Sequence, residues 1–509
     1  MLASLLAVTD GAYTTPVLDW HALLPELILV GAIAVGVIYD SFSREHNSGL
    51  VSTIAGFGFL AALVPLLTLG LSDDGARSMF GGAYMVDDFA LVLKALFLVA
   101  GYVTVLLSTH YIAEGDYPEG EYYVLLVTSV LGMVVMSSAR DLITIFVALE
   151  LLSIPAYMLA GWRKRTRQGI EAGMKYYLMG VFASGVMLYG MSLIFGGTGS
   201  TVLTEIGAAV GGSFGEEPVA VIGIVFVIIG FAFKVSAVPF HHWAPDTYEG
   251  APTPITAFLS VASKSAGFVA LLQLIFIGFL GRADVVRPLM FVFAVLTMTV
   301  GNMIALRQTN IVRLFAYSSI AQAGFILAPL AVVTASDGDV MDRVLSSIVL
   351  YLVVYTVITL GAFAVIIAVS RRTRSGEISS WGGLFTYAPG LAVTMAVFLF
   401  ALGGIPPMVG WFAKFQLFQA VVSAHTGLAY ATALVMAVNT VISLGYYLTV
   451  MRTMFIDDAP DGDHTPVRVP VPLVAAMAIS AVVTVALGFL PGLAADLADT
   501  ATFALIAGQ

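Results

Sequence analysis

The sequence contains no cysteine among its 509 residues. This absence excludes disulfides, thiolate metal sites and cysteine-ligated iron–sulfur clusters from the chain. Any redox chemistry connected with the chain must therefore take place in other proteins. We expect neither a cofactor nor a metal ion to be bound by these residues.

Charge is also scarce, because only 11% of the residues are charged while 59% are hydrophobic. Soluble globular proteins carry about 25% charged residues, so a soluble fold could not bury this much apolar surface. The net charge of -10 is spread over short segments and argues against a nucleic-acid partner. The composition predicts an integral protein of the lipid bilayer.

Long apolar runs are present in large number. A helix needs roughly 20 apolar residues to cross a bilayer. Fourteen such runs occur, and we expect an all-α polytopic membrane protein with about fourteen transmembrane helices in a single membrane domain, residues 1–509. The runs lie near residues 22–40, 50–71, 88–110, 121–138, 141–162, 170–195, 218–240, 254–280, 286–305, 310–333, 344–370, 389–421, 427–455 and 468–490.

Arginine and lysine in the connecting loops predict the orientation. Fourteen spans place both termini on the same side, and cytoplasmic loops are enriched in basic residues. With the termini outside, the inner loops hold twelve basic residues: Arg44, Arg163, Lys164, Arg165, Arg167, Arg307, Arg313, Arg371, Arg372, Arg374, Arg452 and Arg468. The outer loops hold only five: Arg77, Arg140, Arg282, Arg287 and Arg343. We therefore expect both termini on the outer side.

The remaining five basic residues are all lysines inside apolar runs: Lys94, Lys175, Lys234, Lys264 and Lys414. A lysine at the centre of a span costs about 2.5 to 3.5 kcal/mol, so their retention predicts a function such as proton transfer. Lys94 follows Asp87 and Asp88 by about two turns, and we interpret it as a snorkelling ion pair outside the relay. Glu26 is interpreted as a contact to a neighbouring helix or to the membrane interface.

Glu150 lies in the middle of the fifth run, with no other charged residue between Asp141 and Arg163. A carboxylate at this depth needs a cationic partner or a proton. Lys175 and Lys234 are the candidate partners. The alternative is a static ion pair that only holds helices together.

Prolines interrupt two of the runs close to a lysine. Pro239 follows Lys234 by about one turn, and Pro406 and Pro407 precede Lys414 by about two turns. Proline removes a backbone donor and breaks a helix, and in a membrane the freed carbonyls must face protein or a wet cavity. Two broken helices in corresponding places predict two repeats, residues 121–280 and 286–455.

Further titratable or polar groups accompany the breaks. His241 and His242 follow the first break and are expected near the cytoplasmic mouth of a proton path. Lys264 lies between Ser263 and Ser265, small polar residues that allow water around it. This places Lys264 between Lys234 and Lys414 in the expected relay.

Three motifs reveal a family resemblance. The segments from Val238 to Pro254, from Glu150 to Pro155 and from Gly404 to Lys414 resemble the antiporter-like subunits of respiratory complex I. The Tyr-Glu-Gly-Ala-Pro-Thr-Pro form is similar to the subunit N branch rather than to subunits L or M. The resemblance implies two inverted five-helix repeats and a proton relay of Glu150, Lys234, Lys264 and Lys414, with Lys175 as an additional buried lysine.

The resemblance also implies the setting of the chain. It would be a proton-translocating subunit of the NADH-quinone oxidoreductase translocase, without a redox centre of its own. NADH oxidation and quinone reduction in other subunits would drive it. Its expected partners are the antiporter-like subunits M and L, the small helical subunits K and J, and the lipid of the bacterial plasma membrane.

One residue departs from the family pattern. Where the family commonly has histidine, this chain has Gln322. Glutamine does not titrate, so a relay must here use water or other side chains. The competing interpretation is a subunit of a multisubunit cation/proton antiporter, which shares the Pro-Phe-His-Trp-Pro-Asp pattern. The Tyr-Glu-Gly form disfavours it.

Overall fold

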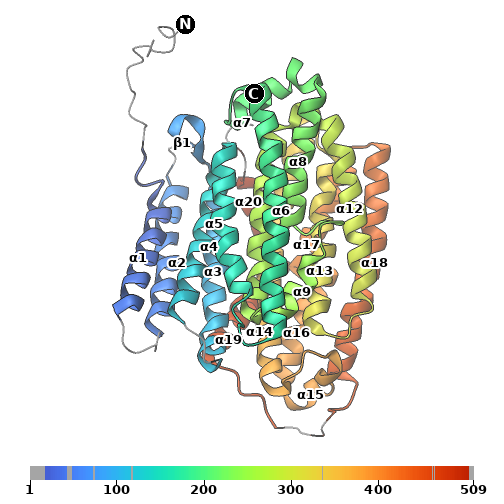
Figure 1. The fold of residues 1–509 in the computed structure, drawn as a ribbon. Helices are drawn as coiled ribbons and strands as arrows, with labels where there is room; N and C mark the ends of the chain where they lie inside the picture. Colours follow the sequence, from blue (N-terminus) through green and yellow to red (C-terminus); the bar gives the residue numbers. More distant parts are fainter. Residues whose placement is uncertain are drawn as a thin grey trace.

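The computed structural model describes residues 18–42, 49–72, 75–115, 119–334, 336–460, 462, 465–501 and 503. Long helices run side by side through the molecule (Figure 1). In these ranges, twelve helices are long and apolar enough to cross a bilayer. They are α1 (Leu24–Phe42), α2 (Gly49–Gly70), α3 (Asp88–Glu114), α4 (Gly120–Ser138), α5 (Leu142–Ala160), α6 (Arg167–Thr198), the continuous helix Thr253–Gly278, the segment Leu280–Ala305 that contains α12 (Ala283–Ala305), the segment Ile311–Val332 that begins with α13 (Ile311–Leu327), α14 (Gly338–Thr373), α18 (Gly427–Phe455) and α19 (Val471–Phe489).

Two further spans are made of broken helices. The apolar helices α8 (Pro218–Lys234) and α16 (Pro389–Gly403) have 17 and 15 residues. At 1.5 Å per residue each covers about 25 Å or less, which is shorter than the hydrocarbon core. After the breaks the chain continues as α9 (Trp243–Gly250) and α17 (Val409–Val422). Twelve long spans and two broken ones confirm the prediction of about fourteen helices, two of them broken.

Proline chemistry explains both breaks. Pro406 has no amide hydrogen, so the carbonyl of Leu402 loses the donor that would continue α16. Gly404 ends that helix with a φ of +79°, a left-handed conformation that suits glycine. In the first break, the amide of Val238 donates to the Thr297 hydroxyl at 2.9 Å instead of to a helix carbonyl. Pro239 and the prolines Pro406 and Pro407 therefore lie where the sequence predicted them.

The helix Thr253–Gly278 carries two π-helical turns. It consists of α10 (Thr253–Phe258), the π-turn Leu259–Ser263, α11 (Lys264–Gln273) and the π-turn Leu274–Gly278. A π-turn widens the helix and is often found at functional sites. Lys264 is the first residue after one of these turns.

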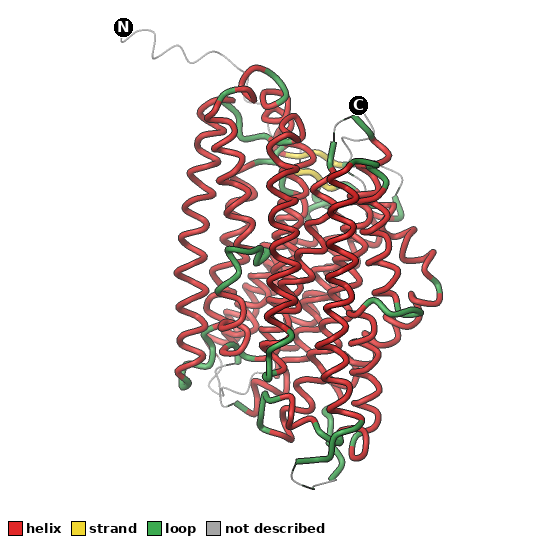
Figure 2. Tube along the Cα trace, turned by 90° about the vertical axis from the view of Figure 1, so that its right-hand side faces the viewer, coloured by secondary structure: helices red, strands yellow, loops and turns green. Residues whose placement is uncertain are grey.

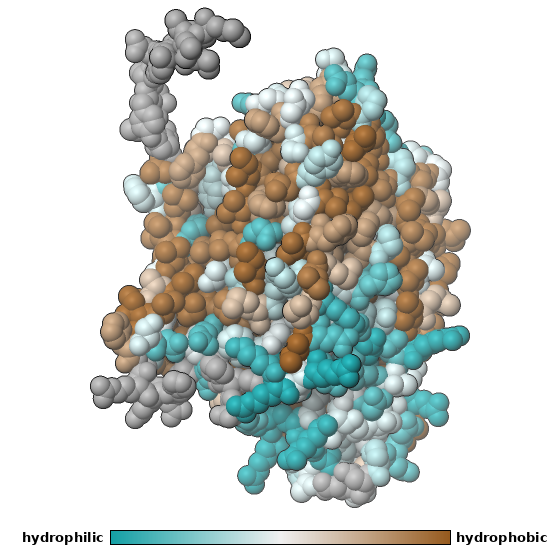
Figure 3. Space-filling view, in the orientation of Figure 1, coloured by the Kyte–Doolittle hydropathy of each residue, from teal (hydrophilic) through white to brown (hydrophobic). Residues whose placement is uncertain are grey.

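The two ends of the bundle differ. One end, here called the hairpin end, carries the antiparallel strands β1 (Arg77–Met79) and β2 (Tyr84–Val86) and the short helix α7 (Leu203–Val210). The opposite end, here called the arginine end, carries α15 (Leu384–Tyr387) and the loops with Arg163, Arg165 and Arg307. Figure 3 shows hydrophilic residues concentrated at the arginine end and a hydrophobic surface above it. Arg44 and both chain termini lie outside the described residues.

Burial separates central from peripheral helices. In Thr253–Gly278 and in the segment Ile311–Val332, 94% of the apolar window is buried, against 22% in α1 and 28% in α19. The side view of Figure 2 shows the tightly packed helices running between the two ends. Lys264 and Gln322 are therefore carried by the two most enclosed spans.

Candidate proton-relay axis

Lys234 lies at the end of α8, where the first break begins, and is only 2% exposed. Its Nζ donates to the Ser153 hydroxyl of α5 at 2.9 Å and to the Tyr176 hydroxyl of α6 at 3.2 Å. The helix with Lys264 packs directly against it, because a Cβ on Gly267 would lie 3.0 Å from the Lys234 Cγ. The absence of a side chain at Gly267 thus allows this close approach.

Glu150 lies one turn before Ser153 on α5. Its Oε1 accepts a hydrogen bond from the Ser184 hydroxyl of α6 at 2.6 Å. Within the described residues, no ion pair of 4.0 Å or less joins Glu150 to Lys234 or to Lys175. The direct contact expected from the sequence is absent because each group finds a hydroxyl on a neighbouring helix. Ser153, which binds Lys234, lies on the same helix as Glu150, so α5 contacts both groups although they do not contact each other.

Lys264 is 3% exposed and lies at the centre of the bundle. Its Nζ donates to the Ser319 hydroxyl of α13 at 2.8 Å and lies 5.6 Å from the centre of the Tyr248 ring. Ser319 in turn donates to the Ala316 carbonyl at 2.7 Å. The ammonium group thus contacts one hydroxyl and an aromatic face, without a carboxylate at ion-pair distance in the part of the chain that the structure describes.

Lys414 lies in α17 beside the second break and is 7% exposed. Its Nζ donates to the Leu402 carbonyl at 3.1 Å, the carbonyl that Pro406 leaves without a helical donor. The same Nζ lies 4.7 Å from the centre of the Phe325 ring. A cavity of about 300 Å³ lined by Phe325, Lys414 and Trp411 adjoins this site. The broken helix therefore supplies both a ligand for the ammonium group and space next to it.

Gln322 connects the surroundings of Lys264 and Lys414. Its Oε1 accepts from the Tyr351 hydroxyl at 2.6 Å, and its Nε2 donates to the Tyr447 hydroxyl at 3.3 Å and to the Leu402 carbonyl at 3.4 Å. Tyr447 also hydrogen-bonds to Ser318, the neighbour of the Ser319 that binds Lys264. Gln322, which stands where the family commonly has histidine, thus binds two tyrosine hydroxyls.

Lys175 is not a buried lysine, in contrast to the expectation from the resemblance. Its side chain is 43% exposed, and its Nζ lies 2.6 Å from both Asp246 Oδ2 and Glu171 Oε1. Asp246 and Glu249 also pair with Arg313, at 3.0 and 2.6 Å. Because Lys175 is near the beginning of α6, these charges form a network towards the arginine end, away from the axis.

The two histidines differ in burial. His241 is buried, at 5% exposure, and its Nδ1 has no hydrogen-bond partner within the described chain. His242 is exposed, with its ring centroid 4.3 Å from that of His241. His241 therefore lies inside the bundle, and His242 lies at its surface.

Lys94 contradicts the interpretation as a snorkelling residue. It is fully buried and forms an ion pair with Glu26 at 2.6 Å. Asp87 instead pairs with Arg140 at 2.8 Å and caps the first turn of α3 through the Ala90 amide. The prediction that Lys94 pairs with Asp87 or Asp88 is therefore wrong. Lys94 lies on the side of α3 that faces α1, where Glu26 is.

Hydroxyl groups were missed by the sequence interpretation. Ser153, Tyr176 and Ser319 bind the axial lysines, and Tyr351 and Tyr447 bind Gln322. The sequence feature that could have indicated them is a serine or tyrosine inside an apolar run. This feature is less informative than a charged residue, which is rare in such runs.

Comparisons with known proteins agree over most of the chain. The family described as "NADH:quinone oxidoreductase/Mrp antiporter, TM" matches residues 139–443, more than half of the sequence. NADH-quinone oxidoreductase subunit N of Rubrobacter xylanophilus is 41% identical over 440 residues, covering 86% of this chain and 88% of the relative. The subunit N protein of Desulforamulus reducens is 40% identical over 477 residues, covering 93% and 95%.

Solved structures give the same fold. A chain of respiratory complex I from Thermus thermophilus with bound aureothin has a TM-score of 0.77 at 31% identity, covering 93% of this chain and 99% of that one. A chain of the Mrp complex from a Dietzia species has a TM-score of 0.81 at 19% identity, which supports the fold alone; it covers 95% of this chain and 97% of that one. The sequence matches show that the chain belongs to the NADH-quinone oxidoreductase subunit N family, whose members are proton-translocating membrane subunits.

Proposed function

We propose that this chain carries protons along the axis of Glu150, Lys234, Lys264 and Lys414. One observation carries the proposal: Lys234, Lys264 and Lys414 are enclosed in the bundle, and across the described ranges none has a carboxylate within 4.0 Å. A nearby carboxylate would hold the ammonium form in place. Lysines bound only to hydroxyls, a carbonyl and ring faces can instead gain and lose a proton.

The groups between the lysines would conduct the proton. Lys264 binds the Ser319 hydroxyl, and the next residue in the sequence, Ser318, bonds to the Tyr447 hydroxyl. Tyr447 in turn contacts Gln322, which donates to the Leu402 carbonyl beside Lys414. A hydroxyl accepts one proton while donating another and so passes a charge on without remaining ionised. Gln322 itself holds the two tyrosines in position, while proton transfer uses their hydroxyls and water.

Glu150 would control the first lysine. Its charge favours the ammonium form of Lys234. The two groups are not in direct contact, because Glu150 binds Ser184 and Lys234 binds Ser153. A movement of α5 or of the broken helix α8 that changes this separation would change how firmly Lys234 holds its proton. The energy would come from NADH oxidation and quinone reduction in other subunits, since this chain is proposed to have no redox centre.

The assembly and the repeats are part of the same proposal. In residues 121–280 and 286–455 the broken helix is the fourth of five spans, which supports two inverted repeats. The relatives' names support a place in NADH-quinone oxidoreductase, respiratory complex I. Within it, the chain is proposed to lie in the bacterial plasma membrane beside subunits M, L, K and J, with both termini outside.

Replacement of Lys414 with alanine tests the relay. In membrane vesicles containing the whole complex, we expect proton pumping to fall by about tenfold or more, because the last buried acceptor is lost. Lys414→Arg should not restore it, since a guanidinium stays protonated. Lys164→Ala, at the exposed arginine end, is the matched control and should pump as the parent does. Parent-rate pumping by Lys414→Ala would overturn the proposal.

The shared fold with the Mrp complex supports one competing function, cation/proton exchange. Sodium-driven proton movement measured without NADH distinguishes the two. Exchange that is retained in vesicles lacking NADH and quinone would favour the antiporter, whereas strict dependence on NADH supports the proposal.

A further inference from the structure

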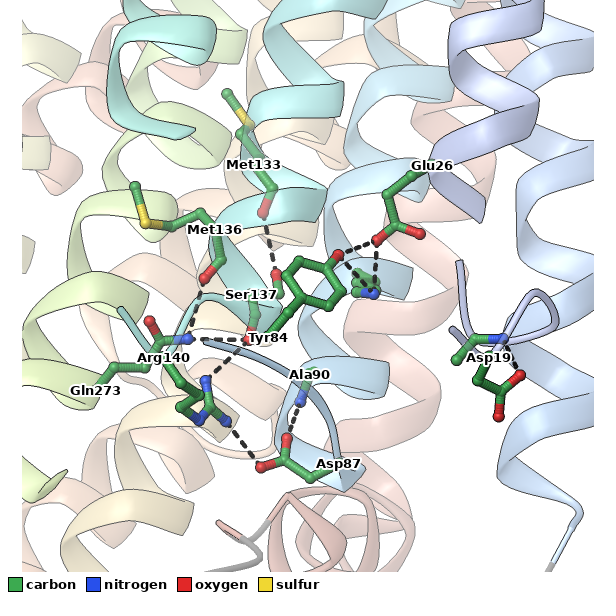
Figure 4. Close-up of polar contacts among 12 residues, drawn as sticks. Asp19, Glu26, Tyr84, Asp87, Ala90, Met133, Met136, Ser137, Arg140 and Gln273 are labelled. Carbon is green, nitrogen blue, oxygen red and sulfur yellow. Dashed lines mark hydrogen bonds and ion pairs between the residues drawn. The ribbon is translucent and has the colours of Figure 1, made fainter. Parts of the chain in front are cut away.

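A second glutamate–lysine pair lies outside both proposed repeats. Lys94 of α3 is fully buried, and its Nζ donates to Glu26 Oε1 of α1 at 2.6 Å. The Tyr84 hydroxyl of β2 donates to the same oxygen at 2.5 Å and lies 3.4 Å from the Lys94 Nζ. Figure 4 shows Glu26 and Tyr84 pointing toward each other. We call Glu26, Tyr84 and Lys94 the N-terminal cluster.

Hydrogen bonding in this cluster is uneven. Both strong donors meet at Glu26 Oε1, while Oε2 is buried and has no partner in the described part of the chain. An ammonium group has three donors, and Lys94 directs them at only two neighbours in the cluster. The cluster therefore has unused capacity for binding a water molecule or a proton.

The neighbouring ion pair serves as a comparison. Asp87 uses one oxygen to cap Ala90 and the other to bind Arg140 at 2.8 Å. Its carboxylate is fully used, and a guanidinium does not release its proton. The Asp87–Arg140 pair is thus a static link. In the N-terminal cluster, by contrast, the Lys94 ammonium can release its proton, and the Tyr84 hydroxyl at 3.4 Å is placed to accept it.

Unpartnered polar atoms lie next to the cluster, because Tyr84 forms an antiparallel β-bridge with Ala139, the residue between Ser138 and Arg140. Among the described residues, Ser138 Oγ, Arg140 Nε and Gln273 Oε1 are buried without a hydrogen-bond partner. Gln273 and Arg140 both donate to the Ser137 carbonyl, at 2.9 and 3.4 Å, so these groups lie close together (Figure 4). Gln273 belongs to α11, the helix that begins with Lys264.

The Tyr84 hydroxyl stays protonated. Burial, together with the charge of Glu26, raises the pKa of Tyr84 well above its usual value. Tyr84 therefore acts by accepting one proton while donating its own, rather than by forming a phenolate.

We propose that Glu26, Tyr84 and Lys94 form a further proton-binding site, which exchanges its proton through the Tyr84 hydroxyl toward Ser138 and Gln273. In the release step, the N–H bond of the Lys94 ammonium breaks and a proton passes to the Tyr84 oxygen. The original Tyr84 proton, after the hydroxyl turns away from Glu26 Oε1, moves to the Ser138 oxygen, and the Ser138 hydroxyl releases its own proton to a water beside it. Both hydroxyls are thus restored, Lys94 becomes neutral and Glu26 remains a carboxylate. Uptake is the reverse. This inference rests on the proposed proton-translocating function.

Tyr84→Phe is the sharpest test, because it removes one oxygen and leaves the Glu26–Lys94 ion pair in place. In vesicles with the whole complex, we expect protons pumped per NADH oxidised to fall by at least about twofold. A static ion pair predicts no change in this ratio. The matched control is Tyr123→Phe, which also removes a buried tyrosine hydroxyl, one without a hydrogen-bond partner in the described chain; its ratio should equal that of the parent.

Lys414→Ala is measured in the same preparation to separate the two proposals. A low ratio for Lys414→Ala with a parent ratio for Tyr84→Phe overturns this inference and leaves the relay standing. A parent ratio for Lys414→Ala overturns the relay itself, and this inference with it. Equal losses in Tyr84→Phe and Tyr123→Phe would mean a general effect of removing a buried hydroxyl and would also overturn the site. Glu26→Gln, which keeps the side-chain length, should lower the ratio as Tyr84→Phe does.

Discussion

Lys234, Lys264 and Lys414 each hydrogen-bond to neutral oxygen atoms, whereas Lys94 and Lys175 each contact a carboxylate at 2.6 Å. This difference decides how each ammonium group behaves when it loses its proton. After it loses its proton, a lysine can still hydrogen-bond to a neutral hydroxyl or carbonyl. When a lysine next to a carboxylate loses its proton, however, the carboxylate becomes an unpaired buried charge. The lysines of the axis are thus better suited to repeated proton transfer. In the N-terminal cluster, Lys94 needs the Tyr84 hydroxyl to accept its proton.

At the same scale, the coupling of Glu150 to Lys234 can be tested. Glu150→Gln should lower pumping, because Lys234 loses the charge that favours its ammonium form, and Lys234→Ala should lower it further. If the two groups act as one unit, the double variant is little worse than the worse single variant. The measurement is the pumping rate divided by the NADH oxidation rate. Fully multiplicative losses would show that the groups act independently.

Gln322 allows a second test at this scale. Gln322→Leu keeps much of the volume but leaves the buried Tyr351 hydroxyl without this partner, at a cost of about 1 to 3 kcal/mol, whereas Tyr447 loses one contact and keeps Ser318. We expect a clear loss of pumping with an assembled complex. Gln322→His, which retains a donor and an acceptor, should change pumping little. A large gain in the histidine variant would contradict a path through hydroxyls and water.

At the scale of helices, the site depends on close contact between α4 and α5. Gly132 of α4 faces the α5 backbone, and a Cβ there would lie 2.5 Å from the Leu152 amide nitrogen. Nearby, the Ser129 hydroxyl donates to the Leu152 carbonyl at 2.7 Å. Because Glu150 and Ser153 flank Leu152, the distance between these helices sets the position of both functional groups.

Gly132→Ala should therefore separate α4 from α5, destabilise the folded chain by about 1 to 3 kcal/mol and lower pumping. Thermal stability of the purified complex and proton pumping are the two measurements. Gly196→Ala of α6 is the control, because a Cβ at Gly196 meets no atom within 4 Å. If Gly132→Ala matched Gly196→Ala in both measurements, the close packing would have no functional importance.

At the scale of the whole molecule, the contrast between the two ends carries information about orientation. The absence of natural cysteines permits a direct test with single cysteines. Ser213→Cys lies exposed at the hairpin end, and Lys164→Cys lies at the arginine end. With a membrane-impermeant thiol reagent, intact cells should label only Ser213→Cys and inside-out vesicles only Lys164→Cys, because basic loops stay in the cytoplasm. The reverse pattern would invert the proposed orientation.

The spans, the breaks and the enclosed lysines followed from local chemistry. The length of an apolar run determines whether it crosses a bilayer, and a proline lacks its amide hydrogen in any fold, so the interruptions near Lys234 and Lys414 were predictable. The placement of Lys264 at the centre also followed, since a charged residue in such a run must avoid lipid.

Only the tertiary structure decided which groups meet. Lys175 pairs with Asp246, 71 residues away, and Lys94 pairs with Glu26, 68 residues away, instead of with its neighbours in the sequence. An apolar run of this kind shows that a residue lies in the membrane, but nearly uniform hydrophobicity leaves the rotation of the helix undetermined. Packing against neighbouring helices sets that rotation. It therefore decided that Lys175 faces the arginine end, that Lys94 faces Glu26, and that tyrosine and serine hydroxyls surround the axis.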